Sequence, residues 1–300
     1  MTTWKNYYLA KDIEDALQAL SGQVQPARIV AGGTDLLLDL QQGRTDSVGT
    51  LVDVTAVPEM GTLEKRTLEV GDELLFVGAA VPLSKVAGSP QVMKHAQALV
   101  EACRLIGGPQ VRNSATLGGN VAHALPAADG SIALLALDAQ AEVACVAADG
   151  GCDRRIVPLS SLFLGPGKSA LRQGCELLVG FYLPLHESGQ ASAFRRIMRP
   201  QGVALPVLNA ACWLERREEK ILDLRVAVGP AGGTPFRARD VEKVLRGSGL
   251  NDASLRSAKK ALLSSVHFRT SPRRASAEYR QHLAGGLVEE VLEAAWERAA

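Results

Sequence analysis

The sequence predicts an α+β fold organised in two domains. With 300 residues, the chain is long enough for about two hydrophobic cores, and its 47% apolar residues suffice to fill them. From residue 180 onward, strand-like segments come first and helical segments follow Pro230. Strands followed by helices are typical of an α+β domain.

The first 56 residues alternate between helical and strand patterns. Apolar residues at helical spacing predict a helix over 12–20, and β-branched runs predict strands over 28–31 and 51–54. Gly32 and Gly33 predict a tight turn between these strands. Thr34 is expected to cap a helix over 35–42.

Residues 57–178 are richer in strands and contain two longer helices. Two strands, over 67–70 and 74–78, are separated by a predicted hairpin turn at 71–73. The other elements expected here are a helix over 90–106, a polar glycine-bearing loop over 107–120, a helix over 130–137, and strands over 142–146 and 156–158.

The remaining third predicts strands and then helices. The expected strands cover 181–183, 193–197, 208–215 and 221–228, and the expected helices cover 238–245, 253–264 and 276–298. We therefore divide the chain into a domain over 1–178, with subdomains of about 1–56 and 57–178, and a C-terminal domain over 179–300.

Composition excludes several functional classes. The 33 basic and 32 acidic residues nearly cancel, which argues against a nucleic-acid binder. The N-terminal segment lacks the apolar region of a secretory signal, and the most apolar stretch, 131–148, is interrupted by Asp138 and Glu142. We therefore expect a cytoplasmic protein without a membrane span.

The cysteines and histidines form no recognisable metal or catalytic pattern. The five cysteines contain no C-x-x-C pair, which argues against a metal or iron–sulfur site, and they are expected to be reduced and buried. The five histidines are dispersed and give no Ser-His-Asp or Cys-His arrangement. We predict no metal ligands and no catalytic residues in this chain.

Two similar glycine loops carry the strongest chemical signal. Gly32 and Gly33 stand beside Thr34, and Gly118 and Gly119 follow Thr116. Glycine lets backbone N–H groups approach an anion closely, and a threonine hydroxyl adds a donor. A lone Gly-Gly is more often a structural turn, but two such loops suit one long diphosphate ligand held at both ends. Neither loop matches the Rossmann or P-loop pattern.

Four runs of the sequence resemble the FAD-binding subunits of the xanthine dehydrogenase and carbon monoxide dehydrogenase family of molybdenum hydroxylases. The runs are IVAGGTDLLLDL (29–40), IGGPQVRNSATLGGNVAHALPAADGSIALLALDA (106–139), FLGPGKSALRQGCELL (163–178) and HFRTSPRRASAEYRQHL (267–283). The resemblance covers nearly the whole chain. It implies a two-part FAD-binding domain of the vanillyl-alcohol oxidase type, followed by a smaller α+β domain.

The resemblance also implies a cofactor, a division of labour and partners. It implies an FAD that receives electrons from two [2Fe–2S] clusters in a small subunit. We expect one non-covalent FAD per chain, because two glycine loops suit a dinucleotide and no His or Cys lies in a recognised flavin-attachment motif. Substrate oxidation belongs to a large molybdenum-cofactor subunit, and the assembly is expected to be a dimer of heterotrimers. Asn120 leads directly to Asp129, so the cysteine-bearing insertion of relatives similar to 4-hydroxybenzoyl-CoA reductase is absent.

The resemblance assigns a set of residues to FAD, namely Ile29, Val30, Ala31, Gly32, Gly33, Thr34, Asp35, Leu36, Ile106, Thr116, Leu117, Gly118, Gly119, Asn120, Asp129, Lys168, Leu171 and Arg196. Several have a simpler alternative. Asp129 suits the N-cap of the next helix, and Asn120 suits a turn. Ile106 and Leu171 suit core packing, and Lys168 suits a solvated loop.

The third domain departs from the family pattern at two points. Arg196 stands where relatives often place a lysine near the flavin, with Arg195 and Arg199 close by. The acidic residue that follows in the family is replaced within residues 203–205. In addition, Leu125 occupies a position where the family has a serine.

The sequence leaves two other functions open. A free-standing FAD oxidase would need its own substrate pocket and a base, and a nucleotide-binding scaffold would need neither. Neither the organic substrate nor the electron acceptor follows from the sequence.

Overall fold

A computed structural model describes residues 3–22, 24–68, 71–147, 150–199, 205–272 and 274–300. The first subdomain is a parallel sheet with strand order β1-β3-β2. Its elements are β1 (Trp4–Leu9), α1 (Ile13–Gly22), β2 (Ala27–Val30), α2 (Leu36–Gln41) and β3 (Val48–Asp53). Parallel strands must be joined by a crossover connection: α1 lies in the connection from β1 to β2, and α2 lies in the connection from β2 to β3.

The second subdomain is an antiparallel sheet with strand order β4-β5-β10-β6-β7. Its strands are β4 (Leu63–Thr67), β5 (Glu73–Gly78), β6 (Gln140–Val146), β7 (Cys152–Pro158) and β10 (Glu176–Pro184). The helices that follow β5 are α3 (Leu83–Gly88), α4 (Pro90–His95), α5 (Gln97–Leu105), α6 (Pro109–Ser114), α7 (Leu117–Ala122) and α8 (Asp129–Ala136). Two single-turn helices, η1 (Glu59–Gly61) and η2 (Leu159–Leu162), and a small hairpin of β8 (Phe163–Gly165) and β9 (Lys168–Ser169) complete it.

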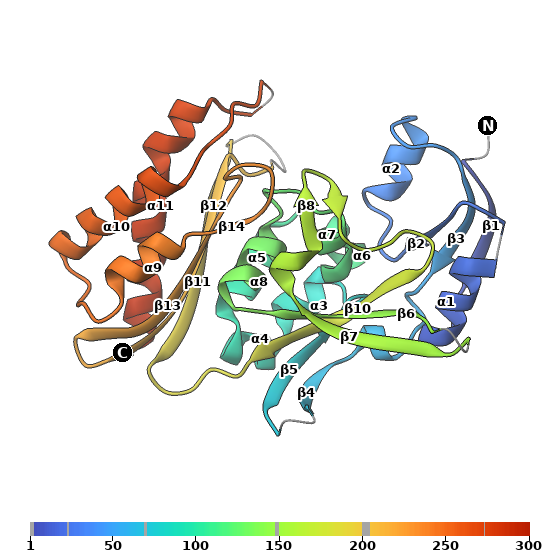
Figure 1. The fold of residues 1–300 in the computed structure, drawn as a ribbon, viewed down its shortest axis with the longest axis horizontal. Helices are drawn as coiled ribbons and strands as arrows, with labels where there is room; N and C mark the ends of the chain where they lie inside the picture. The colour runs from blue at the N-terminus through green and yellow to red at the C-terminus, as the bar shows by residue number, and fades with distance from the viewer. Residues whose placement is uncertain (1–2, 23, 69–70, 148–149, 200–204, 273) are drawn as a thin grey trace.

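The C-terminal domain has an antiparallel sheet covered by helices. The sheet contains β11 (Gln190–Ile197), β12 (Leu208–Arg217), β13 (Lys220–Gly229) and β14 (Phe236–Arg237) in that order. The helices are α9 (Arg239–Leu245), α10 (Asp252–Ser265) and α11 (Ala277–Arg298), and Figure 1 shows them at the end of the molecule opposite β1. α10 begins with a capping box between Asn251 and Ser254, and the Ser276 hydroxyl caps α11.

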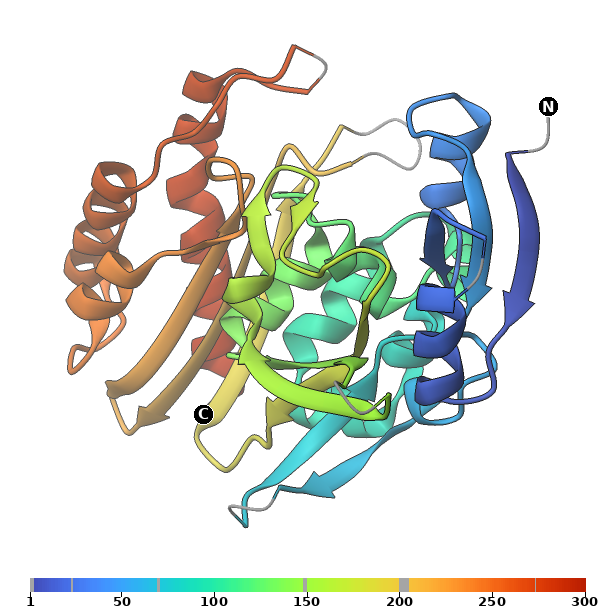
Figure 2. The same cartoon turned by 45° about the vertical axis from the view of Figure 1, so that its right-hand side comes forward.

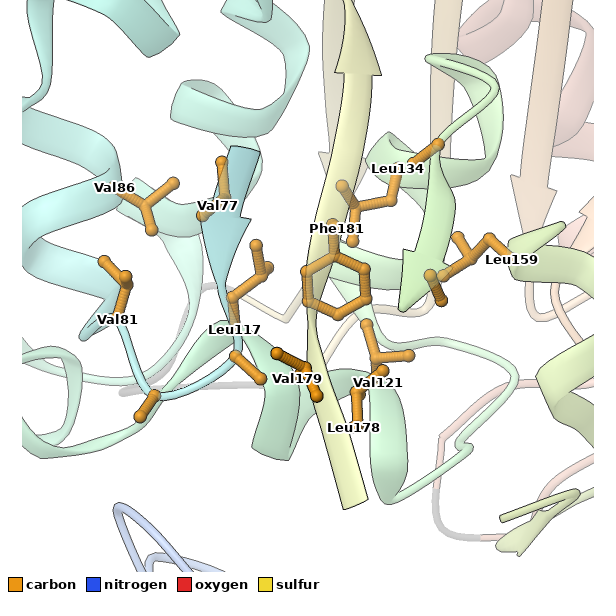
Figure 3. Packing of buried hydrophobic residues seen from close by; sticks show 14 of the residues in the cluster. Val77, Val81, Val86, Leu117, Val121, Leu134, Leu159, Leu178, Val179 and Phe181 are labelled. Atoms are coloured by element: carbon orange, nitrogen blue, oxygen red, sulfur yellow. The ribbon is translucent and has the colours of Figure 1, made fainter. Parts of the chain in front are cut away.

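The main apolar core lies between the five-stranded sheet and its helices. Figure 3 shows Phe181 of β10 surrounded by Leu117, Val121 and Leu134 from α7 and α8. All eight residues of α8 are buried, because the helix is covered by the sheet of the C-terminal domain as well as by its own subdomain. Phe194 and Trp213 of the C-terminal sheet join this core, so the two domains share an apolar interface.

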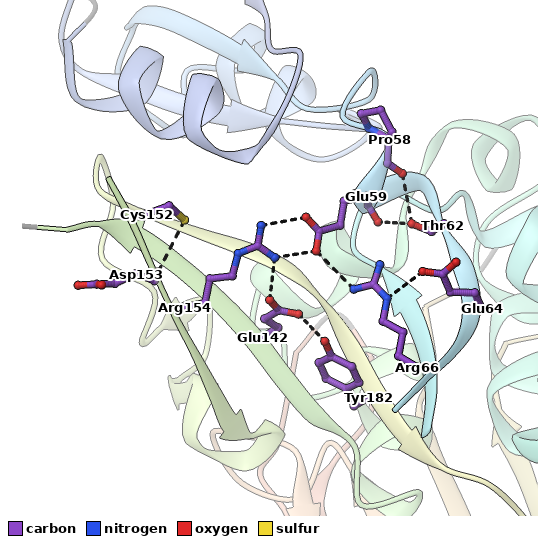
Figure 4. Close-up of polar contacts among 10 residues, drawn as sticks. All are labelled: Pro58, Glu59, Thr62, Glu64, Arg66, Glu142, Cys152, Asp153, Arg154 and Tyr182. Carbon is purple, nitrogen blue, oxygen red and sulfur yellow. Dashed lines mark hydrogen bonds and ion pairs between the residues drawn. The ribbon is translucent and has the colours of Figure 1, made fainter. Parts of the chain in front are cut away.

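A charge network ties the linker between the two subdomains to the five-stranded sheet (Figure 4). Glu59 of η1 accepts both Nη atoms of Arg154 at 2.6 and 2.9 Å. Arg154 also contacts Glu142, whose second oxygen accepts the Tyr182 hydroxyl at 2.8 Å. The hydrogen bond from Arg154 lowers the pKa of Glu59 despite its partial burial. Arg66 completes the network at 3.3 Å from Glu59.

The predicted helices and strands occur in the predicted order, β1, α3, β8, β9 and β14 were not predicted, and four details are corrected. The helix expected over 90–106 is two helices, since Ala96 (φ −151°, ψ 52°) interrupts it. The loop expected over 107–120 contains α6 and the start of α7. β4 spans Leu63–Thr67 rather than 67–70, of which residues 69 and 70 lie outside the described residues. Asp35, not Thr34, is the N-cap of α2, and the cap has no side-chain hydrogen bond. The domain boundary expected at 178 falls inside β10, which pairs with β5 and β6.

Candidate functional site

A cleft of about 860 Å³ opens between the two subdomains and the C-terminal domain. Its volume lies within the range of about 300–1,000 Å³ that is usual for small-molecule and cofactor sites. Much of its lining comes from the loops at 27–36 and 115–120, the residues that lead into α8, the segment around the β8–β9 hairpin, and the edge of the C-terminal sheet. Figure 2 shows β8 and α7 near the centre of the molecule, between α2 and β12.

The first glycine loop follows β2 and has the geometry that glycine permits. Gly33 has φ +65°, and a Cβ there would lie 2.8 Å from Leu37 Cδ1. A Cβ on Gly32 would lie 2.2 Å from the backbone oxygen of Ser114 at the end of α6. Gly32 therefore lets the first loop touch the segment that leads into the second.

The second glycine loop is the first turn of α7. Thr116 is the N-cap, and its Oγ1 accepts the Gly119 N–H at 3.1 Å. A Cβ on Gly118 would lie 2.5 Å from Ala79 Cβ, so this glycine allows α7 to pack against the end of β5. A Cβ on Gly119 would meet only Thr116 Oγ1, at 3.2 Å. Gly119 lines the cleft, and because it has no side chain the space beside its backbone stays open.

A buried ion pair forms the polar wall of the cleft. Arg196 of β11 donates from Nη1 to Asp129 Oδ2 at 2.6 Å, and both side chains are about 5% exposed or less. Asn209 of β12, which pairs with Arg196 across the strands, donates to Asp129 Oδ1 at 2.6 Å and to the Ala127 oxygen. Burial raises the pKa of Asp129, against the lowering effects of Arg196 and Asn209. The wall thus joins α8 to two strands of the other domain.

Four buried polar atoms beside α8 have no hydrogen-bond partner within the described part of the chain. They are Asn120 Oδ1, Ser131 Oγ, Arg196 Nε and Asn209 Oδ1. Ser131 lies on α8, Arg196 and Asn209 both bind Asp129 there, and Asn120 Oδ1 lies 2.6 Å from the place of a Cβ on Gly130. Of these residues, Asn120 and Arg196 line the cleft. Because a buried polar group without a partner is costly, their free acceptor and donor suit a ligand that offers both donors and acceptors.

The cleft brings together nearly every residue expected to contact a cofactor. Ile29 through Leu36, Ile106, Thr116, Gly118, Gly119, Asn120, Asp129, Lys168, Leu171 and Arg196 all line it. Leu117 does not, because its fully buried side chain points into the main core. The alternative of Asp129 as N-cap is wrong, since Ala128 is the N-cap of α8. Gly118 and Gly119 lie in a helix, so only the first loop uses a positive φ.

Sequence reasoning missed several residues of the lining. These are chiefly Arg28, His123, Arg172, Gln173, Gly174, Pro206 and Arg274. Leu125 and Leu205, noted above only as departures from the family pattern, line the cleft too. Arg172–Gly174 stand within a run that already carried the resemblance. Arg274 also stands within such a run, 267–283, whereas Pro206 gave no signal, because only the tertiary fold brings it to glycine loops that are more than 80 residues away in the sequence. Of residues 203–205, within which the family's acidic residue is replaced, 203 and 204 lie outside the described residues.

The cysteines and acidic side chains that the structure describes outside the cleft form no metal site. Among the described residues, no group of three or more His, Cys, Asp or Glu side chains could hold a metal ion. All five cysteines are free; Cys103 and Cys212 are buried as expected, whereas Cys145, Cys152 and Cys175 are partly exposed. In the described part of the chain, no helix has the length and hydropathy that crossing a membrane requires.

Two histidines that are far apart in sequence do meet. The His186 backbone N–H donates to His95 Nδ1 at 3.0 Å, and the His186 ring lies at the edge of Trp213. Burial, followed by the charges of His95 and Arg225, lowers the pKa of His186 to about 3. Neither histidine lines the cleft, so the pair belongs to the junction of the domains.

The fold and the cleft together define a nucleotide-cofactor-binding protein. Residues 2–186 match the family of the FAD binding domain in molybdopterin dehydrogenase, and residues 192–295 match the carbon monoxide dehydrogenase flavoprotein C-terminal domain. The chain therefore belongs to the FAD-binding family of the molybdopterin dehydrogenases. The two matches meet just after β10, where the five-stranded sheet ends.

Individual relatives match over nearly the full chain. The nicotine 6-hydroxylase medium subunit of Paenarthrobacter nicotinovorans is 34% identical, over 95% of this chain and 94% of its own. The xanthine dehydrogenase FAD-binding subunit of Escherichia coli O157:H7 is 30% identical, over 97% and 96%. A solved chain of carbon monoxide dehydrogenase from Hydrogenophaga pseudoflava superposes with a TM-score of 0.89 at 26% identity, covering 99% of this chain and 98% of that one. The expected α+β fold with an FAD-binding domain and a C-terminal domain is confirmed.

Proposed function

We propose that this chain is the FAD-carrying electron-transfer subunit of a molybdenum hydroxylase complex. It would take electrons from [2Fe–2S] clusters of a small partner subunit and pass them to an external acceptor. A large partner subunit with the molybdenum cofactor would oxidise the organic substrate. The names of the relatives, which are medium or FAD-binding subunits, support this division of labour.

The observation that carries the proposal is the cleft with glycine loops on one side and a polar wall on the other. The open side of Gly119 suits the pyrophosphate of FAD, because the lack of a side chain lets the ligand approach the backbone closely. The Thr116 hydroxyl accepts the Gly119 N–H and keeps its own proton to donate to a phosphate oxygen. The unpartnered Asn120 Oδ1 and Arg196 Nε suit a flavin ring, whose edge offers donors and acceptors. When bound, FAD supplies the reversible uptake of two electrons.

The protein's own residues would bind and orient the cofactor. Asp129 holds the Arg196 guanidinium against the cleft wall, and Asn209 fixes the second oxygen of Asp129, so the wall is rigid before any ligand arrives. Leu171, Ile106 and Leu125 supply apolar surface in the lining. These contacts with FAD, and the assembly as a dimer of heterotrimers in the cytoplasm, are part of the proposal.

The test separates this function from a free-standing FAD oxidase and from a scaffold. The chain is purified alone and its absorption spectrum is recorded, and the denatured protein is filtered to show whether the flavin is free FAD. We expect non-covalent FAD that dithionite reduces and that substrates do not reduce. Adding the two partner subunits should make reduction substrate-dependent. Substrate-dependent bleaching in the isolated chain would establish the oxidase instead, and a colourless chain that takes up no FAD would establish the scaffold.

A further inference from the structure

A row of three residues crosses the C-terminal sheet where the sheet packs against α8. Arg196 of β11 lies opposite Asn209 of β12, and Asn209 lies opposite Gly229 of β13. A Cβ on Gly229 would lie 2.4 Å from the Pro126 oxygen and 2.8 Å from Asn209 Oδ1. Gly229 therefore lets the segment before α8 rest on the sheet beside Asn209.

Asn209 contacts the cleft lining from behind. It is fully buried and does not itself line the cleft. Its Nδ2 donates to Asp129 Oδ1 at 2.6 Å and to the Ala127 oxygen at 3.1 Å. An amide nitrogen carries two hydrogen atoms, so both donors of Asn209 are used. The electrostatic influence of Asn209 on the cleft therefore passes through Asp129, a charged residue of the lining.

Asp129 in turn makes a single hydrogen bond to Arg196. Its Oδ2 accepts from Nη1 at 2.6 Å, and no second bond joins these two side chains in the described part of the chain. Arginine and carboxylate groups frequently pair through two parallel hydrogen bonds, which require both carboxylate oxygens. Here Asn209 occupies the other oxygen. Asn209 thus holds the ion pair in what we call the one-bond arrangement.

The one-bond arrangement leaves donors of Arg196 available to the cleft that this residue lines. Its Nε has no partner within the described ranges, and its Nη2 lies 3.1 Å from the sulfur of Met198, a weak acceptor. A cation in surroundings of low polarity stabilises neighbouring negative charge more strongly than a cation in water does. Because reduction adds electrons to a flavin, an available Arg196 guanidinium would favour the reduced cofactor.

We propose that Asn209 is a positioning residue that raises the reduction potential of bound FAD by keeping Asp129 and Arg196 in the one-bond arrangement. This inference rests on the proposed function, because it requires FAD in the cleft. Without the Asn209 amide, Asp129 Oδ1 would be a buried acceptor without a partner, and it would take a second N–H of the guanidinium that Oδ2 already binds. The two-bond pair would turn the positive charge of Arg196 onto Asp129 and weaken its effect on the flavin.

The midpoint potential of the FAD-loaded chain tests this role. Reduction is followed by absorption in the presence of a redox dye of known potential. Leucine resembles asparagine in size and branching but has no donor. We expect Asn209→Leu to bind reduced FAD about tenfold more weakly relative to oxidised FAD, which lowers the potential by about 30 mV for a two-electron couple.

Ser192→Ala is the matched control. Ser192 is buried on the same strand as Arg196, and its Oγ accepts the Ala98 N–H of α5 at 3.1 Å. The variant therefore loses a hydrogen bond between the same two domains without touching Asp129. It should unfold at a lower temperature than the wild type and keep the wild-type potential.

Arg196→Lys tests the pairing itself. A lysine ammonium is a point charge that does not offer the parallel donors of a guanidinium. Asn209→Leu should therefore leave the potential of the Arg196→Lys chain unchanged, although it lowers that of the Arg196 chain. An equal fall in both chains would overturn the role of the one-bond arrangement.

The FAD content and thermal unfolding of the same samples separate the remaining outcomes. A wild-type chain that binds no FAD overturns the proposed function and this inference together. If the wild type binds FAD and Asn209→Leu has an unchanged or higher potential, the inference alone is wrong and Asn209 has only a structural role. If Asn209→Leu does not fold or retains no FAD, Asn209→Ala is measured in its place and judged by the same criterion.

Discussion

A side chain at Gly119 tests the cleft most directly, because the fold and the ligand should respond in opposite directions. Gly119 lies in α7, where alanine is favoured over glycine by about 0.5–1 kcal/mol. Its Cβ would meet only Thr116 Oγ1, at 3.2 Å, a contact that a small shift relieves. We therefore expect Gly119→Ala to leave the FAD-free chain as stable as the wild type or up to about 1 kcal/mol more stable.

The same Cβ would occupy space on the cleft side, so FAD binding should weaken. We expect the Kd for FAD to rise about tenfold in Gly119→Ala, which corresponds to about 1.4 kcal/mol. Gly119→Val adds two further methyl groups and should retain no FAD after desalting. Gly118→Ala is the matched comparison: its Cβ would lie 2.5 Å from Ala79 Cβ and 2.6 Å from the Ala79 oxygen. This overlap should cost about 1–3 kcal/mol of stability.

Urea unfolding of the FAD-free variants and flavin fluorescence titrations measure the two quantities. Opposite signs in Gly119→Ala and a loss of stability in Gly118→Ala would support the assignment of the two glycines. Full FAD occupancy in Gly119→Val would show that the second glycine loop has no part in cofactor binding.

Three further predictions concern charged and buried groups around the cleft. Lys168 is exposed on β9, so Lys168→Ala should change FAD affinity by no more than about 1 kcal/mol in the same titration. Asp129→Asn leaves the buried Arg196 without its carboxylate and should lower the free energy of unfolding by about 3–5 kcal/mol. Asp129→Asn combined with Arg196→Met should recover part of this loss. Equal losses in the single and the double variant would contradict the ion-pair argument. Between pH 6.5 and about 3, unfolded His186 binds a proton that the folded state does not, so stability falls as the pH falls through this window. His186→Gln should reduce that slope by up to about 1.4 kcal/mol per pH unit, and an unchanged slope in urea unfolding would refute the assignment.

Local sequence patterns predicted most of the helices and strands, because each of these elements is marked by the spacing of apolar residues and by turn residues within its own segment. The helix at α1 and the paired strands β12 and β13 follow from apolar periodicity and from a charged turn. The break at Ala96 had no such marker, since neither glycine nor proline stands there. The expected domain boundary at residue 178 lies within β10, a buried strand of nine residues that carries the same apolar pattern on either side of that residue.

The glycine loops could be predicted from the sequence, but their different geometries could not. Gly33 needs a positive φ, whereas Gly32 and Gly118 are glycine because another backbone segment lies where a Cβ would be. These close approaches involve Ser114 and Ala79, which are distant in sequence from Gly32 and Gly118 respectively. A sequence motif records that a side chain is absent, and only the packed structure shows what occupies the vacated space.

For the charged residues of the polar wall, too, the sequence could not predict which side chains would be partners. Asp129 and Arg196 were both assigned to the cofactor, yet 67 residues separate them and nothing in the sequence marks them as partners. Their pairing changes the chemistry expected of each: Asp129 is not a free carboxylate facing a pyrophosphate, and Arg196 is a cation already neutralised on one side. Because Arg196 keeps an unpartnered Nε while Asp129 has both oxygens engaged, the wall offers a ligand a donor rather than a negative charge. An anionic cofactor can therefore lie against an aspartate in this cleft without repulsion, provided that Arg196 and Asn209 stay in place.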